Sequence, residues 1–348
     1  MTYLAGKIAL DVTAGAPNNR RGESNVGEVK QMRIGRDTHP YVSAQAFRRW
    51  LRDSLPAGEP CSPVTRTGTG ARQQAYTRGR PDLYLDDDLF GYMVAIRNES
   101  YQRDTVLATG TLVSVAPSTL VRDFGTMSRG FASGDNPVIH EHQLYSAELA
   151  ADVLLDLPRV GTFELDASGL RTNLSQAAAQ AAIQAGAEEI EFRGVRSIRL
   201  PVPERRRRAA VVLRVLAEVR GGAQKALHYG DRSPALVLLV PVKGGNNPFA
   251  RVLAAHGGQA VFQADALREE LSAWGDEIDG PVLLGWAPGF LGDQREIVRK
   301  ELGDLVSAGS LVIDHPRVLL RGLADQIEAG ESDGWFADAA LKASPAAP

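Results

Sequence analysis

The segment Tyr41–Leu55, which reads YVSAQAFRRWLRDSL, decides the prediction for the first half of the fold. Ser43 is a residue type that caps helix N-termini, because its hydroxyl accepts a hydrogen bond from a free backbone N–H of the first turn. Apolar residues then recur at helical spacing, at Phe47, Trp50, Leu51 and Leu55. We predict an amphipathic helix over residues 43–55, with this apolar stripe facing a core.

Elements on both sides of this helix predict an α+β fold. The apolar, partly alternating run Tyr3–Val12 predicts a strand, and a loop rich in Gly, Pro and Asn follows it. Residues 56–100 interrupt the pattern as an insertion, and residues 103–135 read as a projecting hairpin. A helix over Glu204–Arg220 ends at paired glycines, and ALVLLVPV at 235–242 predicts a buried strand. This order is typical of a sheet with helices in a second layer.

Charge is distributed unevenly along the 348 residues. The formal net charge of −3 argues against a generally basic nucleic-acid-binding protein. However, residues 1–80 hold 13 Lys and Arg against 6 Asp and Glu, while the rest hold 26 against 36. Of the 39 cationic residues 33 are arginine, whose planar guanidinium suits phosphates and bases. A GC-rich genome would also give that bias, but not its position at one end, so we expect a polyanion contact there.

Composition also limits compartment and class. The single cysteine, Cys61, excludes a disulfide within the chain and fits a reducing compartment. The N-terminus lacks a signal-peptide pattern, and no apolar run is long enough to span a membrane. We expect a cytoplasmic protein without a membrane contact.

Candidate phosphate contacts lie in the basic segment. One face of the predicted helix carries residues three, four and seven positions apart: Gln45, Arg48, Arg49 and Arg52. Ser43 lies at the helix N-terminus, where the helix dipole favours an anion. The loop after the first strand offers amide and guanidinium donors in succession, and Lys30 adds a charge: Asn18, Asn19, Arg20 and Arg21. For helix and loop taken alone, a solvated surface is the alternative.

The predicted hairpin carries Met127 near its tip, between Phe124 and Phe131. An apolar side chain on a projecting tip can wedge between bases, and such contacts tolerate many sequences. The alternative is that these side chains pack into the core.

For the other charged clusters, we expect structural roles or surface contacts and not catalysis. Asp86–Asp88 offers carboxylates to a hard cation, but neighbours in sequence rarely all face one ion, so we expect a solvated helix cap. His140 and His142 lack a visible third ligand. Arg205–Arg208 at a helix start needs an anion or acidic partner, so a subunit contact, an RNA contact and a solvated face are alternatives. Phosphate-loop and nucleophile-elbow motifs are absent. We predict no catalytic residue, no metal and no cofactor.

Taken in order, these segments resemble a family of CRISPR-associated proteins. The first strand, the NNRR loop, Lys30 and the Ser-x-Gln-x-x-Arg-Arg helix are similar to the N-terminal signature of backbone subunits of the RAMP superfamily. Further stretches agree: DDDLFGYM, VSVAPSTLVRDFGTMSR, NPVIHEHQLYSAELAADVLLDLPRVGTF and LRVLAEVRGG. The set resembles the DevR autoregulator family, the backbone subunit of type I-B Cascade. The resemblance covers most of residues 1–250.

The resemblance implies a fold and a set of roles. The fold is an RRM-like (ferredoxin-like) palm over residues 1–250, with inserted fingers at about 56–100 and a thumb hairpin at about 103–135. Residues 251–348 form an α/β extension of unassigned role. Copies polymerise along a CRISPR RNA with other Cascade subunits, and the guide pairs with target DNA in antiviral defence. The RNA-binding roles fall on Asn18, Asn19, Arg20, Arg21, Lys30, Ser43, Gln45, Arg48 and Arg49, with Met127 as wedge and Arg129 as clamp.

Two other functions stay open. Relatives in type III complexes cut RNA with an Asp in the loop before this helix. Here that segment has Lys30 in its middle, and Glu28 and Asp37 are its acidic residues. The departure predicts a non-catalytic subunit and leaves a metal-dependent RNase as the alternative. A DNA-binding autoregulator is the third hypothesis, although no helix-turn-helix pattern accompanies the basic segment.

Overall fold

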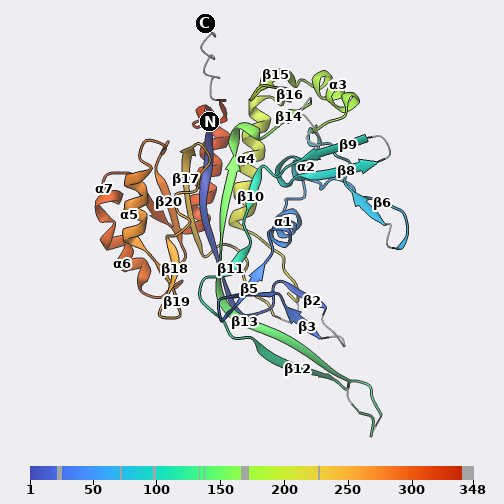
Figure 1. Ribbon diagram of the computed structural model, residues 1–348, viewed down its shortest axis with the longest axis vertical. Coiled ribbons are helices and arrows are strands. Elements are labelled where there is room, and N and C mark those ends of the chain that lie inside the picture. The colour runs from blue at the N-terminus through green and yellow to red at the C-terminus, as the bar shows by residue number, and fades with distance from the viewer. Residues whose placement is uncertain are drawn as a thin grey trace.

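A mixed β-sheet forms the centre of the computed structural model, which describes residues 1–21, 26–70, 73–96, 99–132, 134–136, 138–165, 172–225 and 228–338 (Figure 1). Strand β1 (Thr2–Gly15) lies between β13 (Val138–Asp156) and β17 (Leu236–Lys243) and is antiparallel to both. Side chains of β1 alternate between two cores: Leu4, Ile8, Leu10 and Val12 enter one, and Ala5 and Ala9 enter the other. Both faces of this strand are therefore covered.

The sheet continues on both sides of these strands in the order β21-β20-β17-β1-β13-β11-β5-β4, with β10 also paired to β13. The pair β20–β21 is parallel, whereas the other pairs along this order are antiparallel. The bounds of these strands are β4 (Gln31–Ile34), β5 (Asp37–Val42), β10 (Leu107–Thr109), β11 (Leu112–Ser114), β20 (Val282–Trp286) and β21 (Leu311–Asp314).

Helices cover both faces of the sheet. The larger core lies under α1 (Ala44–Asp53), α4 (Val202–Ala217) and α8 (Pro316–Ala329). The other face is covered by α5 (Ala264–Ala273), α6 (Gln294–Glu301) and the hairpin of β18 (Leu253–His256) and β19 (Gln259–Phe262), with α7 (Gly303–Ser307) following α6. The α+β class and the predicted helix and strand at α1 and β17 are confirmed. The second helical layer was not predicted, and it comes from the C-terminal extension.

Two insertions form smaller units beside α1 and α4 (Figure 1). The first contains β6 (Thr65–Thr67), β7 (Gln74–Tyr76), α2 (Leu85–Phe90), β8 (Tyr92–Ile96) and β9 (Glu99–Arg103). The second packs α3 (Gln176–Gln184) on a sheet of β14 (Thr162–Glu164), β15 (Glu188–Phe192) and β16 (Val195–Arg199), around its own small core. Short 3₁₀ turns lie at η3 (Leu157–Arg159) and η4 (Asp333–Phe336).

A two-stranded arm projects from the central sheet and its helices (Figure 1). It consists of β12 (Val121–Met127) and residues 138–144 of β13, paired from Val121 with Leu144 to Met127 with Val138. At its base lie β2 (Asn19–Arg21) and β3 (Gly27–Val29). The arm begins later in the chain than the expected hairpin at 103–135, because residues 107–114 form β10 and β11 of the central sheet.

Across the described ranges, no helix combines the length and the hydropathy needed to cross a lipid bilayer.

Candidate nucleic-acid interface

The helix α1 forms where the sequence pattern predicts it. The Ser43 hydroxyl accepts a hydrogen bond from the backbone N–H of Ala46 at 3.3 Å, and Ser43 is the N-cap. Phe47, Trp50 and Leu51 are buried against the sheet, which turns the opposite face toward solvent. The hydroxyl for which a phosphate contact is predicted is therefore engaged in the helix cap.

The polar residues on the outer face of α1 have different surroundings. Gln45 is exposed. Arg49, whose side chain is 72% exposed, donates from Nε to the Asp53 carboxylate at 2.8 Å, and that hydrogen bond raises the pKa of Arg49. Arg48 is half-buried, burial lowers its pKa, and no acidic side chain of the described residues pairs with it. Arg48 is therefore a surface cation without an internal counter-charge.

Arg52 lies on the same helix but faces the protein. Its guanidinium donates to the carbonyl oxygens of Phe90 and Gly91 at 3.4 and 3.3 Å and lies 3.7 Å from the Asp86 carboxylate. Burial lowers the pKa of Arg52. These contacts tie α1 to α2, so an RNA phosphate would compete with internal partners at this position.

The loop after β1 is held by backbone contacts. Asn18 is buried, its side-chain amide donates to the carbonyl of Tyr41 at 3.3 Å, and its own carbonyl accepts from Lys30 N–H at 3.2 Å. Asn19 is half-buried at the start of β2, and the backbone of Arg21 pairs with Gly27; the side chain of Arg21 lies outside the described residues. The loop thus joins β2, β3 and β5 into one surface beside α1.

Two cations of this surface are accessible. The exposed Arg20 guanidinium lies 2.9 Å from the Glu28 carboxylate across β2 and β3. Lys30 is half-exposed, and its carbonyl accepts from Tyr41 N–H at 3.0 Å. An ion pair between exposed side chains contributes little to stability, so Arg20 can exchange Glu28 for a phosphate at low cost.

The arm places its apolar side chains in solvent. Phe124, Met127, Val138 and Ile139 are each at least 49% exposed, and Arg129 is exposed beyond the end of β12. Packing in the core, the alternative for Met127 and Phe124, is therefore wrong. The arm points away from α1, so Met127 and Arg129 are not brought to the loop and helix within one chain (Figure 1).

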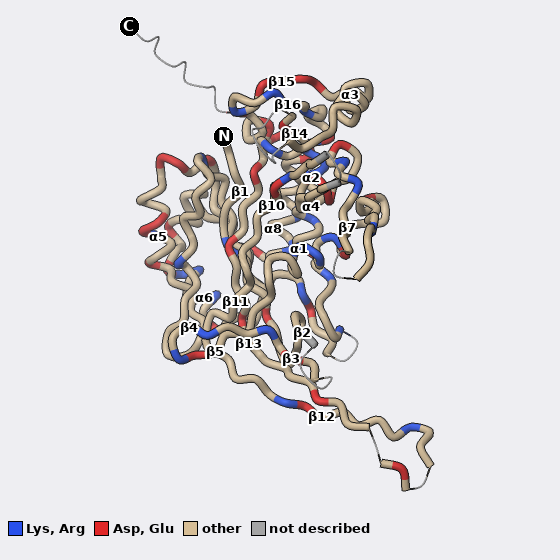
Figure 2. Tube along the Cα trace, turned by 45° about the vertical axis from the view of Figure 1, so that its right-hand side comes forward, with Lys and Arg blue, Asp and Glu red and all other residues tan. Residues whose placement is uncertain are grey.

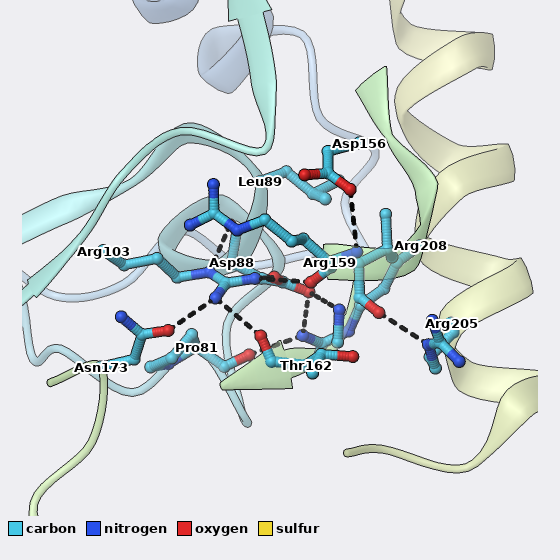
Figure 3. A network of polar contacts seen from close by, with 12 residues as sticks. Pro81, Asp88, Leu89, Arg103, Asp156, Arg159, Thr162, Asn173, Arg205 and Arg208 are labelled. Atoms are coloured by element: carbon cyan, nitrogen blue, oxygen red, sulfur yellow. Dashed lines mark hydrogen bonds and ion pairs between the residues drawn. The ribbon is translucent and has the colours of Figure 1, made fainter. Parts of the chain in front are cut away.

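The acidic run Asp86–Asp88 is in the interior, and its expected role as a solvated cap is wrong. Asp88 receives hydrogen bonds from the guanidinium of Arg103, from Arg208 at 2.8 Å and from Gly161 N–H at 2.9 Å (Figure 3). Burial raises the pKa of Asp87, which accepts from the backbone of Arg80. The described residues bring no three His, Cys, Asp or Glu side chains into an arrangement for a metal ion.

The arginine run Arg205–Arg208 also has internal partners. Arg205 donates to the carbonyls of Val160, Pro158 and Phe336, and burial lowers its pKa to about 10. Arg207 and Arg208 each pair with Glu204 at 2.7 Å, and Arg206 pairs with Asp333. The solvated face, one of the alternatives for this run, is wrong for Arg205 and Arg208, which also have partners in distant parts of the chain.

The structure thus brings α1, the 18–21 loop and Lys30 together as one surface, which we call the cationic surface. In Figure 2, Lys and Arg (blue) lie along α1, whereas Asp and Glu (red) lie along α5 of the extension. Sequence reasoning missed one neighbour of this surface, the described residues 220–225 and 228–233. Its Ala223 N–H donates to the Pro17 carbonyl at 2.7 Å, directly before Asn18. The signal was the glycine pair Gly221-Gly222 between Arg220 and Lys225.

Comparison with known proteins gives a fold and no sequence family. No protein-family model and no curated protein matches the sequence. A chain of the structure titled "CRISPR RNA-guided surveillance complex, pre-nicking" matches with a TM-score of 0.57 and 13% identity, covering 94% of this chain and 99% of that one. A chain of a "CRISPR RNA-guided surveillance complex" matches at 0.55 and 13%, with the same coverage. Over nearly its whole length, the chain has the fold of proteins in CRISPR RNA-guided surveillance complexes.

Proposed function

We propose that this protein is a non-catalytic backbone subunit of a CRISPR surveillance complex, which holds the ribose-phosphate chain of a guide RNA. The fold match across 94% of the chain carries this proposal. The finer assignment is to the DevR family of the RAMP superfamily, in a type I-B Cascade. The guide would be presented for pairing with a target DNA strand, with further copies and other Cascade subunits as partners.

The order of strands and helices supports an RRM-like palm. Helix α1 connects β1 to β10 and β11, and α4 connects β13 to β17, while the four strand positions lie in the order β17, β1, β13, β11. Two interleaved βαβ units of this kind make the ferredoxin-like arrangement. Because the extension covers the face of β1 and β17 opposite α1 and α4, a bound strand would follow the α1 edge instead.

The distribution of cations supports a phosphate contact at that edge. Arg48 has no acidic partner among the described residues, and Arg20 and Arg49 are held only by exposed ion pairs. Each phosphate neutralised by such a residue releases counterions, so affinity should fall steeply with salt. The apolar arm supports contact with bases and with a neighbouring copy, through side chains that have no internal partner surface.

The positions of the acidic residues support a non-catalytic role. Glu28 is paired with Arg20. Asp37 begins the six-residue strand β5 that leads to Ser43, and an extended strand of that length puts roughly 20 Å between them. The test is incubation of the assembled complex with complementary RNA and Mg²⁺. Periodic cuts that disappear in Asp37→Ala would replace the proposal with the RNase alternative.

A charge-reversal variant tests the RNA-binding surface. Arg20, Arg48 and Arg49 changed together to Glu should remove copurifying RNA, because three phosphate contacts become repulsive, while the urea midpoint stays near that of the wild type. The matched control reverses three exposed cations of the extension: Arg251, Arg299 and Lys300. RNA of wild-type amount and length on the first variant would show that the surface is wrong. Promoter binding in a gel shift, without RNA, would favour the autoregulator.

A further inference from the structure

We infer that residues 220–225 and 228–233 are part of the strand-binding surface and that Tyr229 stacks on a base of the bound single strand. This inference rests on the proposed function. Tyr229 is 85% exposed, more than any other large hydrophobic or aromatic side chain of the described residues. An exposed phenol ring can bury its apolar surface against a partner.

The segment is fixed against the cationic surface at its first end. Gly221 and Gly222 have φ of 135° and 93°, and a Cβ on Gly221 would lie 3.0 Å from Cγ of Trp50 in α1. A Cβ on Gly222 would lie 3.4 Å from the Pro17 carbonyl oxygen. Glycine at both positions lets the backbone turn closely over α1 and the 15–18 segment. The chain then continues past Gln224, whose side-chain amide lies next to Gly27 of β3.

The segment is also fixed at its second end. The Asp231 carboxylate accepts from the N–H and hydroxyl of Ser233 at 2.9 and 2.7 Å. Arg232 is buried beneath Gly15 and Gly222, and it donates to the Asp231 carbonyl at 3.1 Å. Tyr229 is thus presented on a loop with both ends anchored, which lowers the entropic cost of a contact made by its ring.

The surroundings of Tyr229 favour a nucleic acid over a protein. A hollow of about 350 Å³ borders Tyr229 and is lined by Arg220, Lys225 and Arg317. Its two acidic residues already have partners, since Glu218 pairs with Arg317 and Asp231 accepts from Ser233. A second hollow of about 480 Å³ is lined by Tyr229 and by Thr13 of β1, among others. Arg220 and Lys225 are exposed and have no acidic partner among the described side chains. An exposed ring flanked by unpaired cations is the combination that binds a single strand through stacking and phosphate contacts.

Buried polar atoms in the same segment have no protein partner. Nε of Arg232, Oε1 of Gln224 and Nε2 of His228 are inaccessible to solvent and make no hydrogen bond with the described residues. Arg232 and Gln224 lie where the segment meets Gly15 and Gly27. Because these atoms are enclosed by the protein, they belong to the anchoring of the segment and not to its contact with RNA.

The test compares ring variants with a charge variant. Fluorescence anisotropy of the full chain with labelled oligouridine RNA should show that Tyr229→Ala weakens affinity roughly 5- to 100-fold, the range for loss of one base–aromatic stack. Tyr229→Phe should keep wild-type affinity because it keeps the ring. The slope of log affinity against log salt should be unchanged in Tyr229→Ala, since the ring neutralises no phosphate. Lys225→Gln should instead lower that slope by about one.

Three outcomes separate the inference from the function. Wild-type affinity in Tyr229→Ala, with RNA still bound by the wild type, overturns the stacking role and leaves the proposed function intact. Normal RNA affinity with lost self-association in that variant identifies a protein contact and also overturns it. Failure of the wild type to bind RNA in any salt overturns the proposed function itself.

Discussion

Arg103 and Arg208 have side chains that are 0% and 2% exposed and that bond to Asp88, whereas Arg49 on α1 is 72% exposed and bonds to a neighbour one turn away. The interior arginines join α4, α2 and β9 through a carboxylate and several backbone carbonyls. Arg49, in contrast, bonds only within its own helix among the described residues. Arginine side chains therefore connect distant parts of the chain in the interior, whereas at the surface of α1 an arginine remains available to a partner.

The comparison shows why charge density alone is a poor guide to a binding surface. Arg205–Arg208 is the densest cationic run in the chain, yet Arg205 and Arg208 are buried. The α1 face has fewer cations and more accessible ones. Accessibility and the lack of an internal counter-charge, as at Arg48, separate an arginine that is available to a partner from one that holds the fold.

The largest expected effect comes from Asp88→Ala. Removal of this carboxylate leaves the buried Arg103 without its acidic partner and Arg208 with Glu204 alone, so we expect a loss of about 3–5 kcal/mol in the free energy of unfolding. Urea unfolding followed by circular dichroism measures it. Asp123→Ala, at an exposed position on the arm, is the control and should change little. A loss below about 1 kcal/mol for Asp88→Ala would mean that the interior arginines do not depend on it.

A smaller, pH-dependent effect is expected at Glu204. Burial opposes ionisation of Glu204, but hydrogen bonds from Arg207 and Arg208 outweigh it and hold its pKa below the ordinary value. A lowered folded-state pKa stabilises the protein above the unfolded-state pKa of about 4.3, and this stability is lost as the pH falls through the folded-state pKa.

Glu204→Gln should therefore cost about 1 kcal/mol near neutral pH, allowing for its half-buried setting. The difference from the wild type should shrink as urea unfolding is repeated from about pH 5 downward. A difference that stays constant over this range would assign the effect of Glu204 to packing and not to its charge.

The smallest expected effect is at Asp53, the partner of Arg49 on α1. Asp53→Asn should change the free energy of unfolding by no more than about 0.5 kcal/mol, because the pair is exposed. It should also tighten RNA binding roughly twofold, since Arg49 no longer shares its charge. Anisotropy with oligouridine measures the second effect. Weaker RNA binding in this variant would show that Asp53 positions Arg49 and does not compete for it.

Local patterns predicted those elements whose stability depends on nearby residues. Ser43 and the stripe from Phe47 to Leu51 specify α1, and the apolar run at β17 specifies a buried strand. The part of the candidate surface that lies in one continuous segment of the sequence was predicted. The burial of Asp88 was not predicted, because its partner Arg208 is 120 residues away in the sequence. Tyr229 was missed for a related reason, since only the folded chain brings Ala223 against Pro17.

Strand β13 runs without interruption from the arm into the centre of the sheet, pairing with β12 at one end and with β1 at the other. The change of partner coincides with a register shift between Val12 and Gly15, where Ala14 has a φ of 46° and its N–H donates to the Ser146 hydroxyl at 2.9 Å. A force applied to the arm would be transmitted along one continuous strand into the central sheet. Binding of a partner to the arm should therefore change the rate of amide hydrogen exchange in β1, far from the point of contact.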